Sequence, residues 1–206
     1  ALTNILDLPE DEKIRAFVSL RDFEQDAYLI MTTRSGIIKK TKLEEYSRPR
    51  ANGIIAINLK GNDELIAVRT SSGSDEILIS TKQGQAIRFN EDKVRSVGRN
   101  SMGVKGISLK GDDFVVSSEV IKDSKTQILT ITENGFGKRT EVEKYRLTSR
   151  GGKGVTTLKI TEKTGKIVNA FQVDNETDVI LLSSVGKANR LKASEISIIG
   201  RATQGV

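Results

Sequence analysis

Basic side chains recur at a fixed position in this chain, four residues after a glycine. The four residues are Lys40, Arg88, Arg139 and Arg190, which follow Gly36, Gly84, Gly135 and Gly186. Lys39 and Lys138 place a second cation directly before two of them. Cations repeated in this way would form a stripe along the molecule, and such a stripe is suited to a polyanion held by its phosphates.

A second basic series lies close to a second set of glycines, Gly53, Gly103, Gly154 and Gly205. Its members are Arg48, Arg50, Arg99, Arg150, Lys153 and Arg201. Glycine allows close approach of the backbone, and successive free N–H groups can form a concavity that binds anions. We therefore expect the twelve basic residues of the two series to contact the phosphates of duplex DNA.

Both series also allow a purely structural interpretation instead of phosphate binding. An acid follows each turn glycine by eight or nine residues, so the first series could form ion pairs within its own unit. These acids are Glu44, Asp92, Glu143 and Glu195. The second series could lie in solvated turns, and the first role expected of the glycines is turn geometry.

Both glycine sets repeat with one period. The first set is spaced by 48, 51 and 51 residues, and the second by 50, 51 and 51. Two independent markers with the same period indicate a true repeat. We expect one domain over residues 1–206, with a half unit at 1–25, whole units at 26–74, 75–124 and 125–174, and a half unit at 175–206.

Each unit is predicted to consist of short β-strands. The apolar runs are rich in Ile, Leu, Val and Thr, and they end at glycine turns typical of β-hairpins. The pattern predicts an all-β, propeller-like disc of about four four-stranded antiparallel blades. Residues 2–20 resemble the strands that the last unit lacks, so either the head closes the ring or both ends are open.

The composition excludes several classes of function. The chain has no Cys and no His, which argues against most metal sites, disulfides and the usual catalytic triads. Tyr46 and Tyr145 occupy equivalent positions where other units have Val94 and Ile196, so we expect packing rather than nucleophilic roles. No run of about 18 apolar residues exists. We expect a cytoplasmic domain without catalysis, cofactor, metal or membrane contact, and its formal charge of +6 suits a polyanionic partner.

The chain resembles the C-terminal domain of DNA gyrase A over essentially its whole length, and five segments carry the most specific resemblance. They are SRPRANGIIAINL, VRSVGRNSMGVKGI, ENGFGKRTEVEKY, SRGGKGV and IIGRATQGV. The resemblance implies a β-pinwheel, a propeller-shaped disc in which neighbouring blades exchange a strand. It also implies that the basic rim wraps duplex DNA, so that the rest of gyrase A, together with gyrase B, introduces negative supercoils with ATP.

One departure from the family pattern bears on wrapping. The family's signature box, Q-R-R-G-G-[KR]-G, is matched best by residues 148–154, which keep R-G-G-K-G but have Thr and Ser in place of Gln and Arg. We interpret this segment as a related blade loop. The alternatives are the equivalent domain of topoisomerase IV, a propeller that binds proteins, and an enzyme in its own right.

Overall fold

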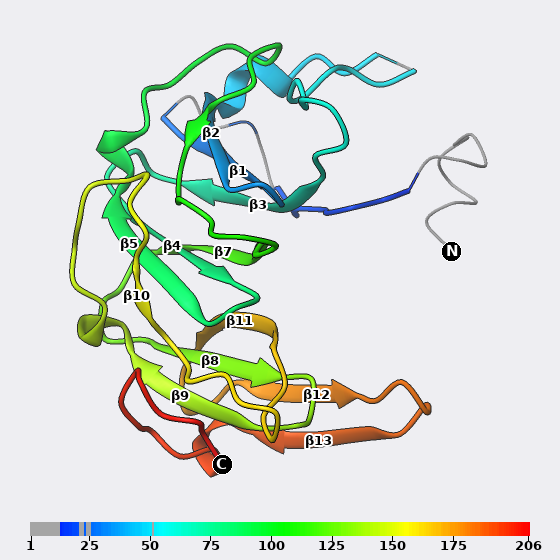
Figure 1. Cartoon of the computed structure of the whole chain (residues 1–206). Helices are drawn as coiled ribbons and strands as arrows, with labels where there is room; N and C mark the ends of the chain where they lie inside the picture. The colour runs from blue at the N-terminus through cyan, green and yellow to red at the C-terminus, as the bar shows by residue number, and fades with distance from the viewer. Residues whose placement is uncertain (1–12, 21–22, 24–25, 51) are drawn as a thin grey trace.

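The computed structural model describes residues 13–20, 23, 26–50 and 52–206. Within these residues, thirteen strands form four sheets, and the helical segments are short 3-10 turns. The sheets follow one another along an open arc, with the first at the top of Figure 1 and the last at the bottom. This architecture confirms the predicted all-β, propeller-like fold.

A β-hairpin and a 3-10 helix open each unit. The hairpins are β1 (Tyr28–Thr33) with β2 (Ile37–Lys42), β4 (Glu76–Thr81) with β5 (Gln85–Asn90), β8 (Gln127–Thr132) with β9 (Gly137–Glu141), and β12 (Asp178–Leu182) with β13 (Ala188–Lys192). The 3-10 helices are η2 (Leu43–Tyr46), η3 (Glu91–Lys93), η4 (Val142–Lys144) and η5 (Ala193–Glu195). Later in the first three units come the long strands β3 (Leu65–Ser71), β7 (Val115–Ile121) and β11 (Ile167–Val173). Two short strands, β6 (Val104–Lys105) and β10 (Val155–Thr156), complete the set.

The hairpin turns explain the first glycine set. In the first hairpin, Gly36 has φ +84° and its N–H donates to the carbonyl of Thr33 at 3.0 Å. The hydroxyl of Thr33 in turn accepts a hydrogen bond from the Ile37 N–H at 3.2 Å. The same pattern recurs at Thr81 and Thr132, so a threonine three residues before a left-handed glycine specifies the turn.

Each of the first three sheets is completed by the following unit. Strand β6 pairs with β2, with Ile37 opposite Lys105, and β10 pairs with β5, with Gln85 opposite Thr156. In the third sheet, Val206 and Gly137 exchange backbone hydrogen bonds of 2.9 and 3.0 Å. The strand order is therefore β3-β1-β2-β6 in the first sheet and β10-β5-β4-β7 in the second. The exchange of strands implied by the family resemblance is present.

The second glycine set makes this exchange possible. Gly103, Gly154 and Gly205 have φ values of +95°, +76° and +80°. A Cβ on Gly103 would lie 2.4 Å from the carbonyl oxygen of Ile38, and one on Gly154 would lie 2.3 Å from that of Ala86. These glycines approach the backbone of the preceding sheet, where the sequence suggested approach to a phosphate.

The apolar core is divided among the contacts between successive sheets, which we call seams. At the first seam, Ile30 and Ile38 of the first sheet pack with Ile77, Ile79 and Ile87 of the second. Another cluster joins the third and fourth sheets through Leu129, Val173 and Val179. Most side chains in these thin layers are aliphatic, which agrees with an aromatic content of only 4%.

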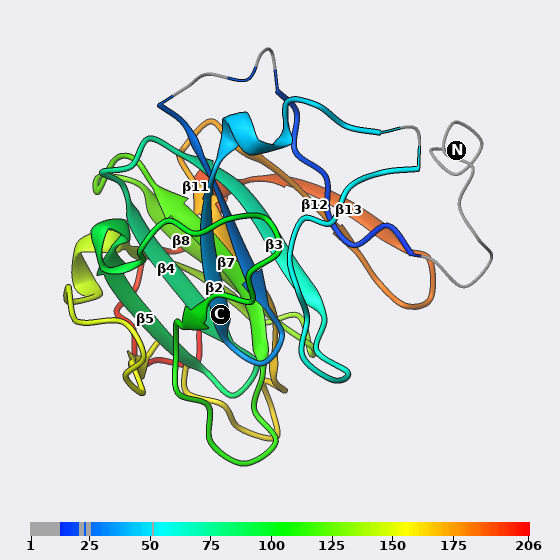
Figure 2. The same cartoon turned by 90° about the horizontal axis from the view of Figure 1, so that it is seen from above.

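The two ends of the arc do not pair with each other in the described part of the chain. Ala16, Val18 and Leu20 pack against the core of the first sheet, and Arg15 forms an ion pair with Glu64 at 2.7 Å. Strands β12 and β13 lie at the opposite end of the arc (Figure 1). Figure 2 looks down on the first sheet, with the later sheets behind it. Of residues 2–20, which were predicted either to close the ring or to form an open end, residues 2–12 lie outside the described residues.

We predict that Gly154→Ala destabilises the fold far more than Gly53→Ala. Both glycines have nearly the same positive φ, +76° and +77°, so both variants carry a left-handed cost of about 1–2 kcal/mol. Only Gly154 faces a backbone carbonyl, whereas nothing lies within 4 Å of a Cβ on Gly53. Overpacking adds roughly 1–3 kcal/mol to the Gly154 variant. Urea denaturation measures the difference, and equal losses in the two variants would contradict the role assigned to the exchanged strand.

Candidate nucleic-acid interface

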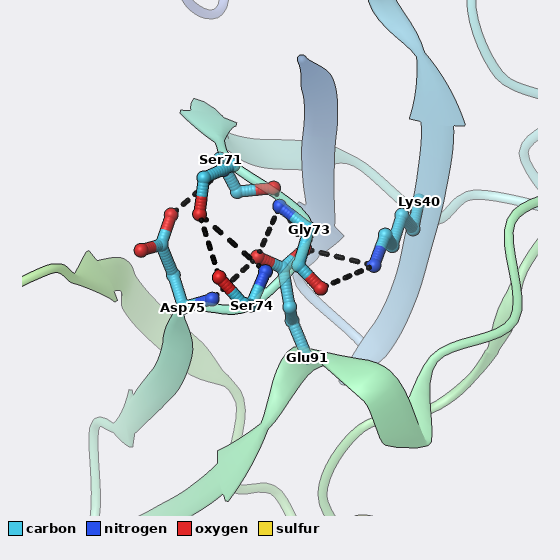
Figure 3. A network of polar contacts seen from close by, with 7 residues as sticks. Lys40, Ser71, Gly73, Ser74, Asp75 and Glu91 are labelled. Atoms are coloured by element: carbon cyan, nitrogen blue, oxygen red, sulfur yellow. Dashed lines mark hydrogen bonds and ion pairs between the residues drawn. The ribbon is translucent and has the colours of Figure 1, made fainter. Parts of the chain in front are cut away.

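Three members of the first basic series are buried in the seams. Lys40 lies in β2 and reaches Glu91 at the start of η3, with 2.9 Å between Nζ and Oε2 (Figure 3). Glu91 is fully buried and also accepts hydrogen bonds from the Ser71 hydroxyl and from the N–H groups of Gly73 and Asp75, at 2.8 to 2.9 Å. The Lys40 ammonium lies 4.4 Å from the centre of the Tyr28 ring. The charge of Lys40 is therefore neutralised inside the first seam.

Arg88 and Arg139 repeat this connection at the next two seams. Arg88 pairs with Glu76 of its own hairpin and donates to the carbonyls of Val142 and Tyr145, both at 3.0 Å. Arg139 donates to the carbonyl of Ile196 at 2.8 Å and to Asn175 Oδ1 at 2.7 Å. In each case a cation in one hairpin binds groups around the 3-10 helix of the next unit. The partners of the three cations differ from the acids Glu44, Asp92, Glu143 and Glu195 that the sequence suggested.

Arg190 occupies the same position in the fourth hairpin but faces solvent. Its side chain is 71% exposed and pairs with Asp178 at 2.7 Å. This hydrogen bond from Arg190 lowers the pKa of the Asp178 carboxyl.

Lys39 and Lys138 lie in the interior, and their burial corrects the expectation that they contact phosphate. Lys39 Nζ donates to the carbonyls of Ala56, at 2.6 Å, and Arg99. Lys138 Nζ donates to the carbonyls of Gly200, at 2.6 Å, and Arg201. Burial lowers the pKa of each lysine to about 8, and the neighbouring arginine of the loop contributes in the same direction. These two lysines fix the loops that carry Arg99 and Arg201.

Three arginines of the second series are held in the same way at successive seams. Arg99, Arg150 and Arg201 each donate to the carbonyl two residues after the second glycine of the preceding unit. The acceptors are Ile55 at 2.8 Å, Lys105 at 3.0 Å and Thr156 at 2.9 Å. All three arginines are half-buried, so each guanidinium lies at the surface of a seam in a fixed position.

Exposed basic residues complete this surface. Arg48, Arg50 and Lys153 of the second series are exposed. Four more exposed residues, which follow or end the 3-10 helices, were not predicted from the sequence: Lys93, Arg95, Lys144 and Arg146. The two pairs are 51 residues apart, so the period that revealed the other series was the signal that could have found them.

The basic loops share the outer side of the arc. In Figure 1 the short helices η3, in green, and η4, in yellow-green, lie on the left, while the hairpin turns point the other way. The loops that follow these helices carry the exposed cations.

Tyr145 is buried beside them and its hydroxyl lies 2.6 Å from that of Thr157, which fits the expected packing role.

Two cavities lie on the side of the arc that carries the hairpin turns. One of about 780 Å³ lies between the first hairpin turn and residues 109–114, and one of about 810 Å³ lies between the third and fourth sheets. Among the described residues, no three acidic side chains gather as a metal site. None of the helices in that part of the chain has the length and apolar character needed to span a membrane.

The repeated sheets with exchanged strands define a β-propeller domain. A family model described as "DNA gyrase C-terminal domain, beta-propeller" matches residues 27–72, 75–122, 126–174 and 177–206, and the chain belongs to this family. The DNA gyrase A protein of Salmonella typhimurium is 46% identical over 205 residues, covering 100% of this chain and 23% of that protein. The DNA gyrase A protein of Staphylococcus epidermidis is 45% identical over 207 residues, with the same coverage. The chain thus spans about a quarter of the length of these relatives.

Solved structures show the same similarity. The C-terminal domain of DNA topoisomerase IV superposes with a TM-score of 0.92 at 28% identity, covering 100% of this chain and 64% of that one. The DNA gyrase A C-terminal domain superposes with a TM-score of 0.89 at 30% identity, covering 100% of this chain and 69% of that one.

We predict that the buried lysines make stability rise with pH above about 8. Because the pKa of Lys138 is about 8 in the folded chain and 10.5 for the free side chain, the unfolded chain binds more protons between these values. Folding therefore becomes more favourable as the pH rises from 8 to 10.5, by an amount on the order of 1–3 kcal/mol. In Lys138→Met this contribution disappears.

Urea midpoints measured from pH 7 to pH 10.5 test this prediction. The difference between wild type and Lys138→Met should shift in favour of the wild type as the pH rises. The exposed Lys60→Met variant serves as the control and should follow the wild-type curve. A constant difference between wild type and Lys138→Met at every pH would contradict the prediction.

Proposed function

We propose that this chain binds duplex DNA along its outer loops and bends the duplex around the arc, as the wrapping module of a gyrase. The observation that carries the proposal is the repetition of one arrangement at three seams, where Arg99, Arg150 and Arg201 are held by equivalent carbonyls. Membership of the gyrase C-terminal domain family supports it. Contacts of this kind neutralise phosphates and do not read bases.

The energetics of bending explain why the contacts have to be distributed. Smoothly bending 20–30 base pairs by 40–90° costs on the order of 1–6 kcal/mol. A row of cations along a curved edge offsets this cost, because each additional contact is gained only by the bent duplex. The hydrogen bonds that join each unit to the next keep the row from moving with the DNA.

The chain acts, in this proposal, without catalysis of its own. The remainder of gyrase A and the gyrase B protein are its partners in the bacterial cytoplasm, and they perform ATP-dependent strand passage on the wrapped segment. Arg48, Arg50, Arg99, Arg150, Lys153 and Arg201 contact DNA together with the exposed residues that follow η3 and η4. Arg190 is open to the same use, whereas Lys39, Lys40, Lys138, Arg88 and Arg139 are committed to the interior.

The equivalent domain of topoisomerase IV is the second candidate, and the TM-score of 0.92 favours it. The identity of 46% with a gyrase A protein favours gyrase, compared with 28% for the topoisomerase IV structure. Sealing nicked circular DNA in the presence of the chain separates the two, because a chiral wrap changes the linking number. An unchanged linking number despite binding would favour the topoisomerase IV assignment.

Affinity as a function of duplex length and salt tests the proposal directly. We expect binding to tighten up to several tens of base pairs, and the logarithm of the affinity to fall with the logarithm of salt at a slope that reports several phosphates. A flat length dependence with a shallow slope would show that these cations do not form a continuous DNA track.

We predict that Arg95→Glu/Arg146→Glu weakens DNA binding at least about tenfold and lowers the salt slope by about 2. The matched control is Lys60→Glu/Lys110→Glu, which makes the same change in charge. Lys60 and Lys110 are exposed and lie beside the hairpin turns, at the opposite end of the strands from Arg95 and Arg146. A six-residue strand is roughly 20 Å long, so the two pairs are separated by more than the Debye length at 0.1 M salt. Equal losses in the two double variants, or no loss in either, would contradict an interface on the outer loops.

A further inference from the structure

The three seams are built alike but differ in charge on the outer side. Each seam has four equivalent positions, which are the seam arginine and three residues around it. At the first seam they are Glu45, Ile55, Arg99 and Met102; at the second, Lys93, Lys105, Arg150 and Lys153; and at the third, Lys144, Thr156, Arg201 and Gln204. All four positions are basic only at the second seam, while the first has no net charge at these positions.

Hydrogen bonds from Arg150 to the backbone of two lysines fix its position at the second seam. Arg150 donates from Nε to the carbonyl of Lys93 at 2.7 Å and from a terminal nitrogen to the carbonyl of Lys105 at 3.0 Å. The Lys105 side chain runs across the loop, because a Cβ on Gly151 would lie 3.9 Å from its Cγ and Cδ. Lys93, Lys105 and Lys153 are exposed. Asp92 pairs with Lys93 at 3.2 Å, which leaves an excess of positive charge.

The interior beneath the second seam differs as well. The first and third seams place a buried ammonium, that of Lys39 or Lys138, under the loop. The equivalent residue at the second seam is Ile87, and a Cβ on Gly152 would lie 3.6 Å from its Cδ1. The loop is fixed instead by backbone groups, with Gly151 N–H donating to the carbonyl of Gly106 at 2.6 Å. Every cation at these positions therefore lies on the outer side.

We propose that the second seam is the primary phosphate-binding site of the chain, where a duplex docks before it bends toward the other two seams. This inference rests on the proposed function and adds a defined place and order of contact. The ligand is the sugar-phosphate backbone of one duplex, bound by Lys93, Lys105, Arg150 and Lys153. The position of the site favours this order, because the second seam lies midway along the arc and the DNA reaches both neighbouring seams from it.

The test removes two cations at the second seam and two at the third. Lys105→Thr/Lys153→Gln copies the residues found at the third seam, so the change introduces only side chains that this loop type already accepts. The matched control at the third seam is Lys144→Gln/Lys159→Gln. Lys159 lies at this seam because its N–H donates to the carbonyl of Thr203 at 2.9 Å. Both replaced residues are exposed, and the loss of charge is the same. The probe is a duplex of about 15 base pairs, roughly 50 Å long.

We expect Lys105→Thr/Lys153→Gln to lose at least about tenfold in affinity and to lower the salt slope by about 2, while the control changes less than about threefold. Thermal unfolding of each variant shows that the fold is intact. Equal losses in the two variants would overturn the primary site and indicate a uniform charged edge. Absence of any binding by the wild-type chain would instead overturn the proposed function itself.

Discussion

The short strand that each unit gives to the sheet before it is the constraint on which the rest of the structure depends. At Gly103 and Gly154 the added Cβ would lie within 2.4 Å of a backbone carbonyl, so the two backbones meet as closely as packing allows. This contact fixes the register between units. It also determines where the preceding loop emerges, which is why Arg99, Arg150 and Arg201 find equivalent carbonyls at each seam.

The repeated basic residues have two different roles. Those in the first three hairpins, such as Lys40 and Arg88, are desolvated and satisfied by an acid or by carbonyls of the next unit, so removing either partner would leave a buried group without compensation. Those in the loops stay in contact with water and keep their charge available to a polyanion. Basic residues that repeat with one period in the sequence thus fall into two groups in the structure. One group is buried and binds the next unit, and the other forms the outer surface.

The sequence predicted the fold better than the interface. The glycine period near 50 residues and the apolar runs that end at glycine turns reflect local geometry, and local geometry is readable from residue type. The burial of Lys39 and Lys138 depends on carbonyls up to 63 residues away, which no short-range pattern reports. Lys93 and Lys144 could have been found, because they obey the same period as the residues that were noticed.

The exchanged strand also sets an order on synthesis. Ile37 in β2 can pair with Lys105 only after the ribosome has added 68 more residues. Gln85 can pair with Thr156 only after 71 more residues. During translation each sheet therefore keeps an open edge until most of the next unit has been made, and open edges are the sites at which strands pair with the wrong partner. At each point of translation the most recently formed sheet has an unpaired edge. A pause within the following unit therefore prolongs the time for which this edge is exposed.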